Sequence, residues 1–206
     1  VTKINDTTIT MFSTKKKKIF VLLGHPYDKS LCSALSDVYV EEAERAGHEV
    51  RYAKLGSLVF DPILHKGYVE RQELEPDLVT FQQNICWAEH VVFVFPTWWG
   101  TMPALLKGLF DRAWLPGFAF NFKKNGFGWK KHLKGRTAHI ITTSNSPAFI
   151  LNWIFGARLS ELRLLTLWFS GFAYPRMTRF SGMAKPREGC VPCVLKKVRK
   201  LGKKGL

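Results

Sequence analysis

The feature that most constrains this chain is a repeated alternation of short apolar runs with amphipathic segments. Residues 18–24 and 90–95 are apolar almost throughout, and such runs are typical of strands buried on both faces of a sheet; residues 137–143 are interpreted as a further strand. A segment with helical spacing of apolar residues follows each of them. Strands that alternate with helices predict a parallel sheet covered on both faces, and right-handed crossovers make it a doubly wound α/β sheet.

The spacing predicts five strands and five helices. Strands are expected at 18–24, 48–54, 90–95 and 137–143, with the fifth within 165–174; helices are expected at 30–46, 71–88, 104–114, about 149–162 and 191–203. Ser30 is expected to cap the first helix and Gly47 to stop it.

Length and composition favour one domain. The chain has 206 residues, of which 46% are hydrophobic, which is enough for a sizeable core. We expect residues 1–17 to form a flexible leader, and residues 18–206 a single domain that ends in a basic helix. Whether residues 1–10 are native is open. Apolar runs stay below the ~18 residues needed to span a bilayer, and the first ten residues lack a secretory signal, so a cytoplasmic protein is expected.

Charge indicates an anionic partner. Thirty-one Lys and Arg against 16 Asp and Glu give a formal charge of +15. Such an excess attracts phosphate-bearing cofactors, nucleic acid or an anionic membrane face. The Lys-rich stretches carry no recognised nucleic-acid motif, so solvated surface is the favoured interpretation and nucleic acid the disfavoured one.

The four cysteines do not indicate a disulfide framework in a domain of this size. We expect Cys32 and Cys86 to be buried thiols. Cys190 and Cys193 form a lone CxxC without a second ligand pair, so no metal site is expected, and the two residues are interpreted as the start of a helix.

In a doubly wound sheet, ligands bind beyond the carboxyl ends of the strands. That rule selects three loops, at 24–32, 96–103 and 142–147. The first opens a helix whose amides attract phosphate, and it lacks both the dinucleotide and the P-loop glycine patterns. The second contains two adjacent tryptophans that suit a planar ring, and the third supplies small donors. Together they match flavin mononucleotide: a phosphate anchor, a bed for the isoalloxazine ring, and donors at the ring edge.

The chain resembles the flavodoxin-like NAD(P)H:quinone oxidoreductases, the family related to DT-diaphorase. The resemblance rests on segments between about residues 18 and 150: GHPYDKSLCSAL (24–35), AGHEV (46–50), FDPIL (60–64), LEPDL…Q (74–82), WAEHVVFVFPTWWGTMPALLKGLFDR (87–112), PGFAF (116–120) and HIITTSNSP (139–147). It implies a five-stranded parallel sheet of order 2-1-3-4-5.

The resemblance also implies roles for individual residues. Phosphate and ribityl contacts fall on His25, Ser30, Leu31 and Cys32; ring contacts on Pro96, Thr97, Trp98, Trp99 and Gly100; ring-edge donors on Thr142, Thr143, Ser144 and Asn145. Phe120 and Phe122 match aromatics that cover the acceptor site of a homodimer partner. Ser144-Asn145 replaces paired glycines of the mammalian-type enzymes. The Tyr and His that follow there are missing here, so no catalytic acid is named.

The implied activity is that of an FMN-dependent enzyme, with FMN favoured over FAD because the long C-terminal region of the mammalian enzymes is absent. NADH or NADPH would reduce the flavin, and a quinone-like acceptor would then take two electrons in a ping-pong mechanism. Two alternatives stay open: a regulatory flavoprotein that docks on a membrane transporter, and a basic nucleic-acid-binding protein on the same scaffold. The acceptor and the choice of nicotinamide cofactor also stay open.

Overall fold

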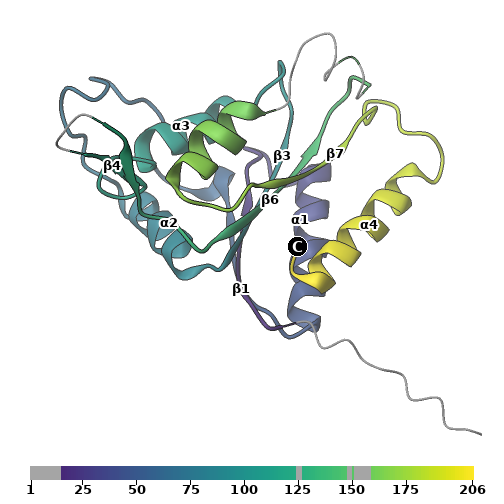
Figure 1. The fold of residues 1–206 in the computed structure, drawn as a ribbon. Coiled ribbons are helices and arrows are strands. Elements are labelled where there is room, and N and C mark those ends of the chain that lie inside the picture. The colour runs from purple at the N-terminus through teal and green to yellow at the C-terminus, as the bar shows by residue number, and fades with distance from the viewer. Residues whose placement is uncertain (1–14, 124–126, 148–149, 151–158) are drawn as a thin grey trace, which may run out of the picture.

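Five parallel strands form the central sheet of the computed structural model, which describes residues 15–123, 127–147, 150 and 159–206. The strands lie in the order β2-β1-β3-β6-β7 (Figure 1), which confirms the predicted order. Their bounds are β1 Lys18–Leu23, β2 Glu49–Lys54, β3 His90–Pro96, β6 Thr137–Thr143 and β7 Arg176–Phe180.

Helices cover both faces of this sheet. α1 (Leu31–Arg45) and α4 (Cys190–Lys204) pack on one face; α2 (Pro76–Trp87), α3 (Ala104–Ala113) and the wide, π-type helix η3 (Glu161–Trp168) lie on the other (Figure 1). Because side chains alternate along a strand, each central strand serves both cores. Phe20 and Leu22 face α2 and α3, whereas Val21 faces α1 and α4. The alternation explains why β1 and β3 are apolar over most of their length.

Two glycines allow helices to approach the sheet and each other closely. A Cβ on Gly24 would lie 2.7 Å from Leu106 of α3, and one on Gly202 of α4 would lie 2.5 Å from the Tyr39 carbonyl oxygen of α1. The backbone of α1 leaves no room for a side chain at Gly202, whereas a side chain at Gly24 would require the Leu106 methyl to move. α1 and α4 are therefore closely packed, and α1 follows directly on the loop at 24–30.

The predicted ends of α1 are confirmed. Ser30 is the N-cap, and its side chain accepts a hydrogen bond from the Ser33 amide. Gly47, with φ 84°, follows the end of the helix. The cap fixes the direction in which the loop before α1 approaches the helix N-terminus.

Other predicted boundaries are wrong. The fifth strand is not within 165–174: η3 occupies the first part of that range, and β7 begins at Arg176. α2 begins at Pro76 rather than Arg71, because proline is favoured at a helix's first position. A short antiparallel hairpin, β4 (Phe120–Phe122) with β5 (Trp129–Lys131), was not predicted. The helix expected from residue 149 falls mostly outside the described residues.

The cysteine predictions are confirmed in part. Cys32 is buried and α4 begins at Cys190, but Cys86 is exposed. The buried side of α2 is formed by Leu78, Phe81 and Ile85. Position 86 follows Ile85 by one residue, about 100° around the helix, and therefore points away from the core. The described part of the chain contains no group of His, Cys, Asp and Glu that could hold a metal. Residues 1–14 of the expected leader are outside it.

Candidate functional site

The three loops selected from the sequence interlock at the carboxyl edge of the sheet. The Thr97 amide donates to the Thr143 carbonyl oxygen at 2.7 Å, and the Thr97 and Thr142 hydroxyls lie 2.8 Å apart, which ties the second loop to the third. The Cys32 sulfur lies 3.3 Å from the Thr143 hydroxyl, which ties the first loop to the third. The His25 and Trp98 rings, 5.4 Å apart and edge to face, tie the first to the second.

The first loop presents hydrogen-bond donors at the N-terminus of α1. The amides of Leu31 and Cys32 have no acceptor among the described residues, because they precede the first intrahelical bonds. Nδ1 of His25 accepts from the Tyr27 amide at 2.9 Å. Partial burial lowers the pKa of His25 from its ordinary value, so the neutral ring predominates at pH 7 and its proton lies on Nε2. Three N–H groups with the polarity that an anion needs are thus available on this loop.

Cys32 itself is not suited to nucleophilic chemistry. Its side chain is 1% exposed, and burial raises the pKa of the thiol to about 11. The protonated thiol therefore predominates at neutral pH, and its sulfur is a packing and hydrogen-bonding group.

The second loop is a tight turn that holds two tryptophans in solvent. Trp98 and Thr101 exchange both backbone hydrogen bonds, at 2.9 and 3.0 Å. The two residues between them, Trp99 and Gly100, have φ of 49° and 83°, the pattern of a type I′ turn. Trp99 is fully exposed and Trp98 is 44% exposed. The backbone of Trp99 is strained, because bulky residues rarely adopt the left-handed region. The exposure of both indoles shows that they are not part of the core.

A contact that sequence reasoning missed fixes this turn. The Thr101 hydroxyl donates to Oε1 of Glu161 at 2.8 Å, joining the turn to the start of η3. The two residues are 60 positions apart, and no pattern in the sequence signals the pair. Pro96, at the end of β3, and Thr97 are buried on the other side of the turn.

The third loop is mostly buried. Thr142, Thr143 and Ser144 are buried, and Asn145 is exposed. The Ser144 amide donates to the Phe180 carbonyl oxygen at 2.9 Å, and the Ser144 carbonyl oxygen accepts from the Met183 amide at 3.0 Å. The end of β7 and the segment after it therefore support this loop. This contact was not predicted from the sequence, because the fifth strand was expected within 165–174.

Phe120 and Phe122 lie away from the three loops' contacts, on the β4–β5 hairpin. Their rings pack edge to face at 5.3 Å, and Phe120 also contacts Phe169 at 4.9 Å. Phe122 is 69% exposed. An aromatic side chain held in solvent by a hairpin can cover a surface on another molecule.

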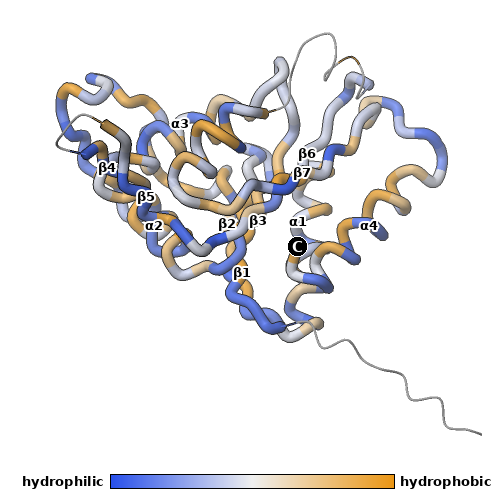
Figure 2. The backbone as a smooth tube through the Cα atoms, viewed as in Figure 1, coloured by the Kyte–Doolittle hydropathy of each residue, from blue (hydrophilic) through white to orange (hydrophobic). Residues whose placement is uncertain are grey.

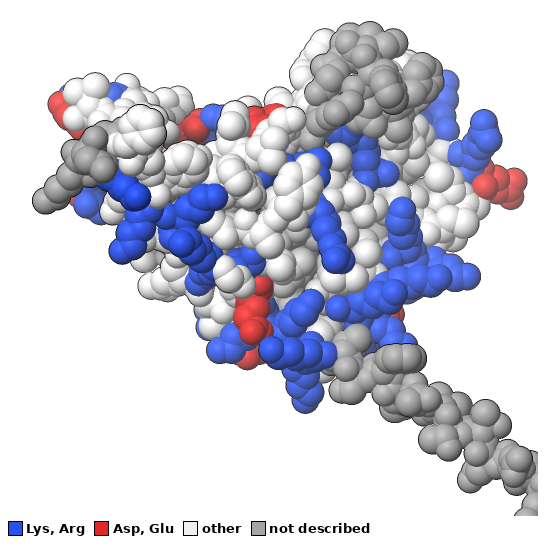
Figure 3. Space-filling model, in the orientation of Figure 1, with Lys and Arg blue, Asp and Glu red and all other residues white. Residues whose placement is uncertain are grey.

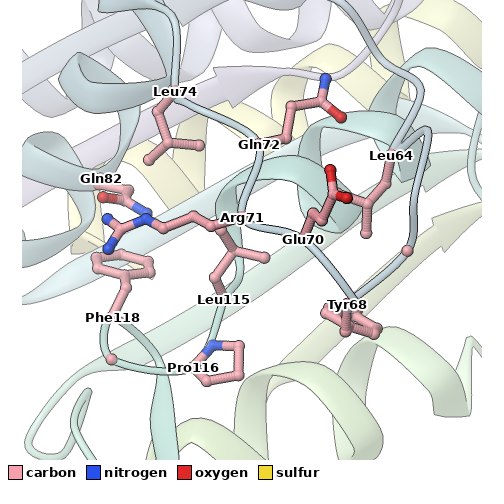
Figure 4. Close-up of a pocket in the computed structure, with 12 residues that line it drawn as sticks. Leu64, Tyr68, Glu70, Arg71, Gln72, Leu74, Gln82, Leu115, Pro116 and Phe118 are labelled. Carbon is pink, nitrogen blue, oxygen red and sulfur yellow. The ribbon is translucent and has the colours of Figure 1, made fainter.

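A cavity of about 500 Å³ lies at another place (Figure 4). Its walls come from the connection before α2, from α2 itself and from the segment after α3, and they include Leu64, Arg71, Gln82 and Phe118. None of the residues predicted for the flavin lines it. The connection, α2 and the segment after α3 therefore enclose this cavity, which is separate from the three loops.

The sequence model of a family described as having a flavodoxin-like fold matches residues 17–201. The chain belongs to this family, which confirms the resemblance drawn from its motifs.

Individual relatives carry oxidoreductase names. A ribosyldihydronicotinamide dehydrogenase-like protein of Penicillium crustosum is 33% identical over 125 residues, covering 49% of this chain and 45% of that protein. NAD(P)H dehydrogenase [quinone] 1 of Cavia porcellus is 28% identical over 200 residues, covering 82% and 71%. An FMN-dependent NADH-azoreductase of Bacillus anthracis, solved in complex with FMN, superimposes with a TM-score of 0.73 at 18% identity, covering 91% of this chain and 98% of that one.

Proposed function

We propose that this protein is an FMN-dependent NAD(P)H oxidoreductase that passes two electrons to a quinone-like acceptor by a ping-pong mechanism. The observation that carries the proposal is the interlocking of three loops at one sheet edge, with unpaired helix amides in the first loop and exposed indoles in the second. A cofactor with a phosphate tail and a planar ring system fits that combination.

The phosphate end of FMN would lie at the N-terminus of α1. The amides of Leu31 and Cys32 and the Nε2–H of His25 supply donors, and the helix dipole adds a favourable field. The side chain of Ser30 is engaged as the N-cap, so its part is to hold the amides in place. This donor set suits a monophosphate, which supports FMN over FAD.

The ring would lie against the second and third loops. Pro96, Thr97, Trp98, Trp99 and Gly100 would line its plane, and Thr142, Thr143, Ser144 and Asn145 its edge. When bound, FMN supplies reversible two-electron chemistry to the site. The chain's own contribution is to hold the turn that carries Trp98 and Trp99 through Thr97 and Thr101, so that a planar reactant finds a preorganised aromatic surface.

The names of the relatives support the choice of reaction. A quinone dehydrogenase and an FMN-bound azoreductase both use a nicotinamide cofactor according to those names. Either NADH or NADPH would serve here as the hydride donor. Phe122, exposed on the hairpin, would cover the acceptor site of a second copy, so we propose a homodimer.

An absorbance spectrum tests the function directly. The purified chain, reconstituted with excess FMN and then desalted, should keep a flavin spectrum in the visible region. NADH or NADPH should bleach that spectrum without oxygen, and a soluble quinone should restore it. A chain that is folded by circular dichroism and retains no FMN would refute the proposal, and retention without bleaching would refute the oxidoreductase activity.

A charge placed at the helix N-terminus tests the phosphate site. Ser30→Asp keeps an N-cap of equal quality, so we expect the stability of the chain to change by less than about 0.5 kcal/mol. The new carboxylate would repel the FMN phosphate, and we expect the Kd for FMN to rise on the order of 100-fold. Fluorescence titration measures it. Thr80→Asp, on the exposed side of α2, adds the same charge elsewhere and should leave the Kd unchanged.

A further inference from the structure

The last helix presents a continuous basic face to solvent. Six cationic residues of α4 are exposed: Lys196, Lys197, Arg199, Lys200, Lys203 and Lys204. At 100° per residue they span about 160° of the helix circumference and about 12 Å of its length. The opposite side, with Val194 and Val198, is buried against α1. Figure 2 shows hydrophobic and hydrophilic residues alternating along α4, and Figure 3 shows Lys and Arg gathered over this part of the surface.

Acidic side chains do not neutralise this face. Residues 189–206 contain no Asp or Glu. Among the described residues, α4 makes one ion pair, between Arg199 and Glu42 at 3.9 Å, and the five lysines make none. Lys197 lies over the Phe180 ring, 5.7 Å from its centre. At neutral pH the face therefore carries a row of cations with almost no internal compensation.

A buried histidine near α4 is affected by the same positive charges. Burial is the main cause that lowers the pKa of His139 to about 4, and the charges of Arg176 and Lys197 lower it further. Lys197 of α4 therefore acts on the amino end of β6 together with Arg176 of β7.

The chemistry of the face favours a lipid surface over nucleic acid. α4 packs against α1 through its apolar side and leaves its cationic side exposed. Between residues 190 and 204 there is no aromatic residue, Asn, Gln, Ser or Thr, so the face lacks the side chains that stack on bases and most of those that read base edges. A bare row of cations is what a layer of anionic headgroups attracts.

We infer that the exposed face of α4 is a peripheral docking surface for bilayers rich in anionic phospholipid. The association is electrostatic and reversible, because each lysine adds a modest attraction and salt screens it. The described residues include no helix long and apolar enough to cross a membrane, so the contact is with the headgroup layer. This inference goes beyond the proposed function and does not depend on it, since a chain that binds no flavin would keep the same surface.

Co-sedimentation of the full chain with vesicles tests it. One set of vesicles is phosphatidylcholine alone, and the other contains one third phosphatidylglycerol. We expect binding to the second set only, and we expect it to weaken as salt is raised. The variant with Lys196→Gln, Lys200→Gln, Lys203→Gln and Lys204→Gln should lose about fivefold in partitioning for each lysine removed, hence several-hundred-fold in total. Replacing the same four residues with arginine should preserve binding.

A matched control separates this face from net charge. The variant with Lys66→Gln, Lys107→Gln, Lys130→Gln and Lys134→Gln loses the same charge from other elements and should bind as the original chain does. Equal losses in the two glutamine variants would overturn the inference, as would equal binding to both kinds of vesicle. Tighter binding to duplex DNA than to the anionic vesicles at the same salt would also overturn it. Flavin retention, measured in parallel without vesicles, reports on the proposed function separately.

Discussion

Replacing Arg112 with methionine is expected to lower the free energy of unfolding by about 3 kcal/mol. Arg112, on α3, is 1% exposed, and its guanidinium pairs with both carboxylate oxygens of Glu75, at 2.9 and 3.1 Å. It also donates to the carbonyl oxygens of Asp61 and Glu73. Removing the guanidinium takes two hydrogen bonds from Glu75, which keeps the Asp61 amide as a donor, and one from each carbonyl. That loss costs more than the methionine packing returns.

Urea unfolding measures the effect. Lys107→Met is the matched control, because Lys107 lies on the same helix and its ion pair with Asp111 is exposed; we expect a change below about 1 kcal/mol there. Adding Glu75→Leu to Arg112→Met should recover part of the lost stability by removing the unpaired carboxylate. A loss below about 1 kcal/mol for Arg112→Met alone would show that the buried pair does not hold this region.

Acid is expected to destabilise the fold through two buried histidines. Burial is the main cause that lowers the pKa of His90 to about 3 and that of His139 to about 4. Their second ring nitrogens have no hydrogen-bond partner among the described residues. In the unfolded chain these histidines take up protons near pH 6.5, whereas in the folded chain they stay neutral until much lower pH. The free energy of unfolding therefore falls as the pH falls below 6.5. Each histidine is expected to remove roughly 2 kcal/mol between pH 8 and pH 5.

Urea unfolding at a series of pH values checks this expectation. The double variant His90→Gln with His139→Gln should lose most of the pH dependence in that interval, although its stability at pH 8 is lower because two hydrogen-bonded side chains change. His65→Gln, at an exposed position, should leave the pH dependence nearly as it was. A slope that survives the double substitution would assign the acid sensitivity to other groups.

β1 and β3 could be predicted from sequence because they are buried on both faces and are apolar over most of their length. β6 is buried too, although its sequence TAHIITT mixes Thr and His with Ala and Ile. β7 is an edge strand whose sequence RMTRF contains two arginines and one buried residue, Phe180, so no continuous apolar run marks it. The apolar stretch before it belongs to η3, and strand and helix cannot be told apart over short apolar runs. β4 and β5 have three residues each, among Gly and Lys, and such a segment resembles a loop.

The site was predictable to the extent that topology determines it. Parallel strands bring their carboxyl ends to one edge, so the loops at 24–32, 96–103 and 142–147 were found without a structure. The side-chain contacts that lock them depend on long-range packing. Thr101 with Glu161, and Ser144 with the segment after β7, join residues that no local pattern relates. Assignment of the individual flavin contacts remains a prediction.

The Arg112 cluster also bears on how this fold can diversify. The Arg112 guanidinium binds Asp61 before residues 62–72 and binds Glu73 and Glu75 after them. The two ends of this loop are therefore held together. Doubling the length of such a loop costs only about 0.6 kcal/mol in closure entropy. Lineages could therefore lengthen or rewrite residues 64–72, which wall the cavity in Figure 4, while the sheet and its ligand edge stay as they are.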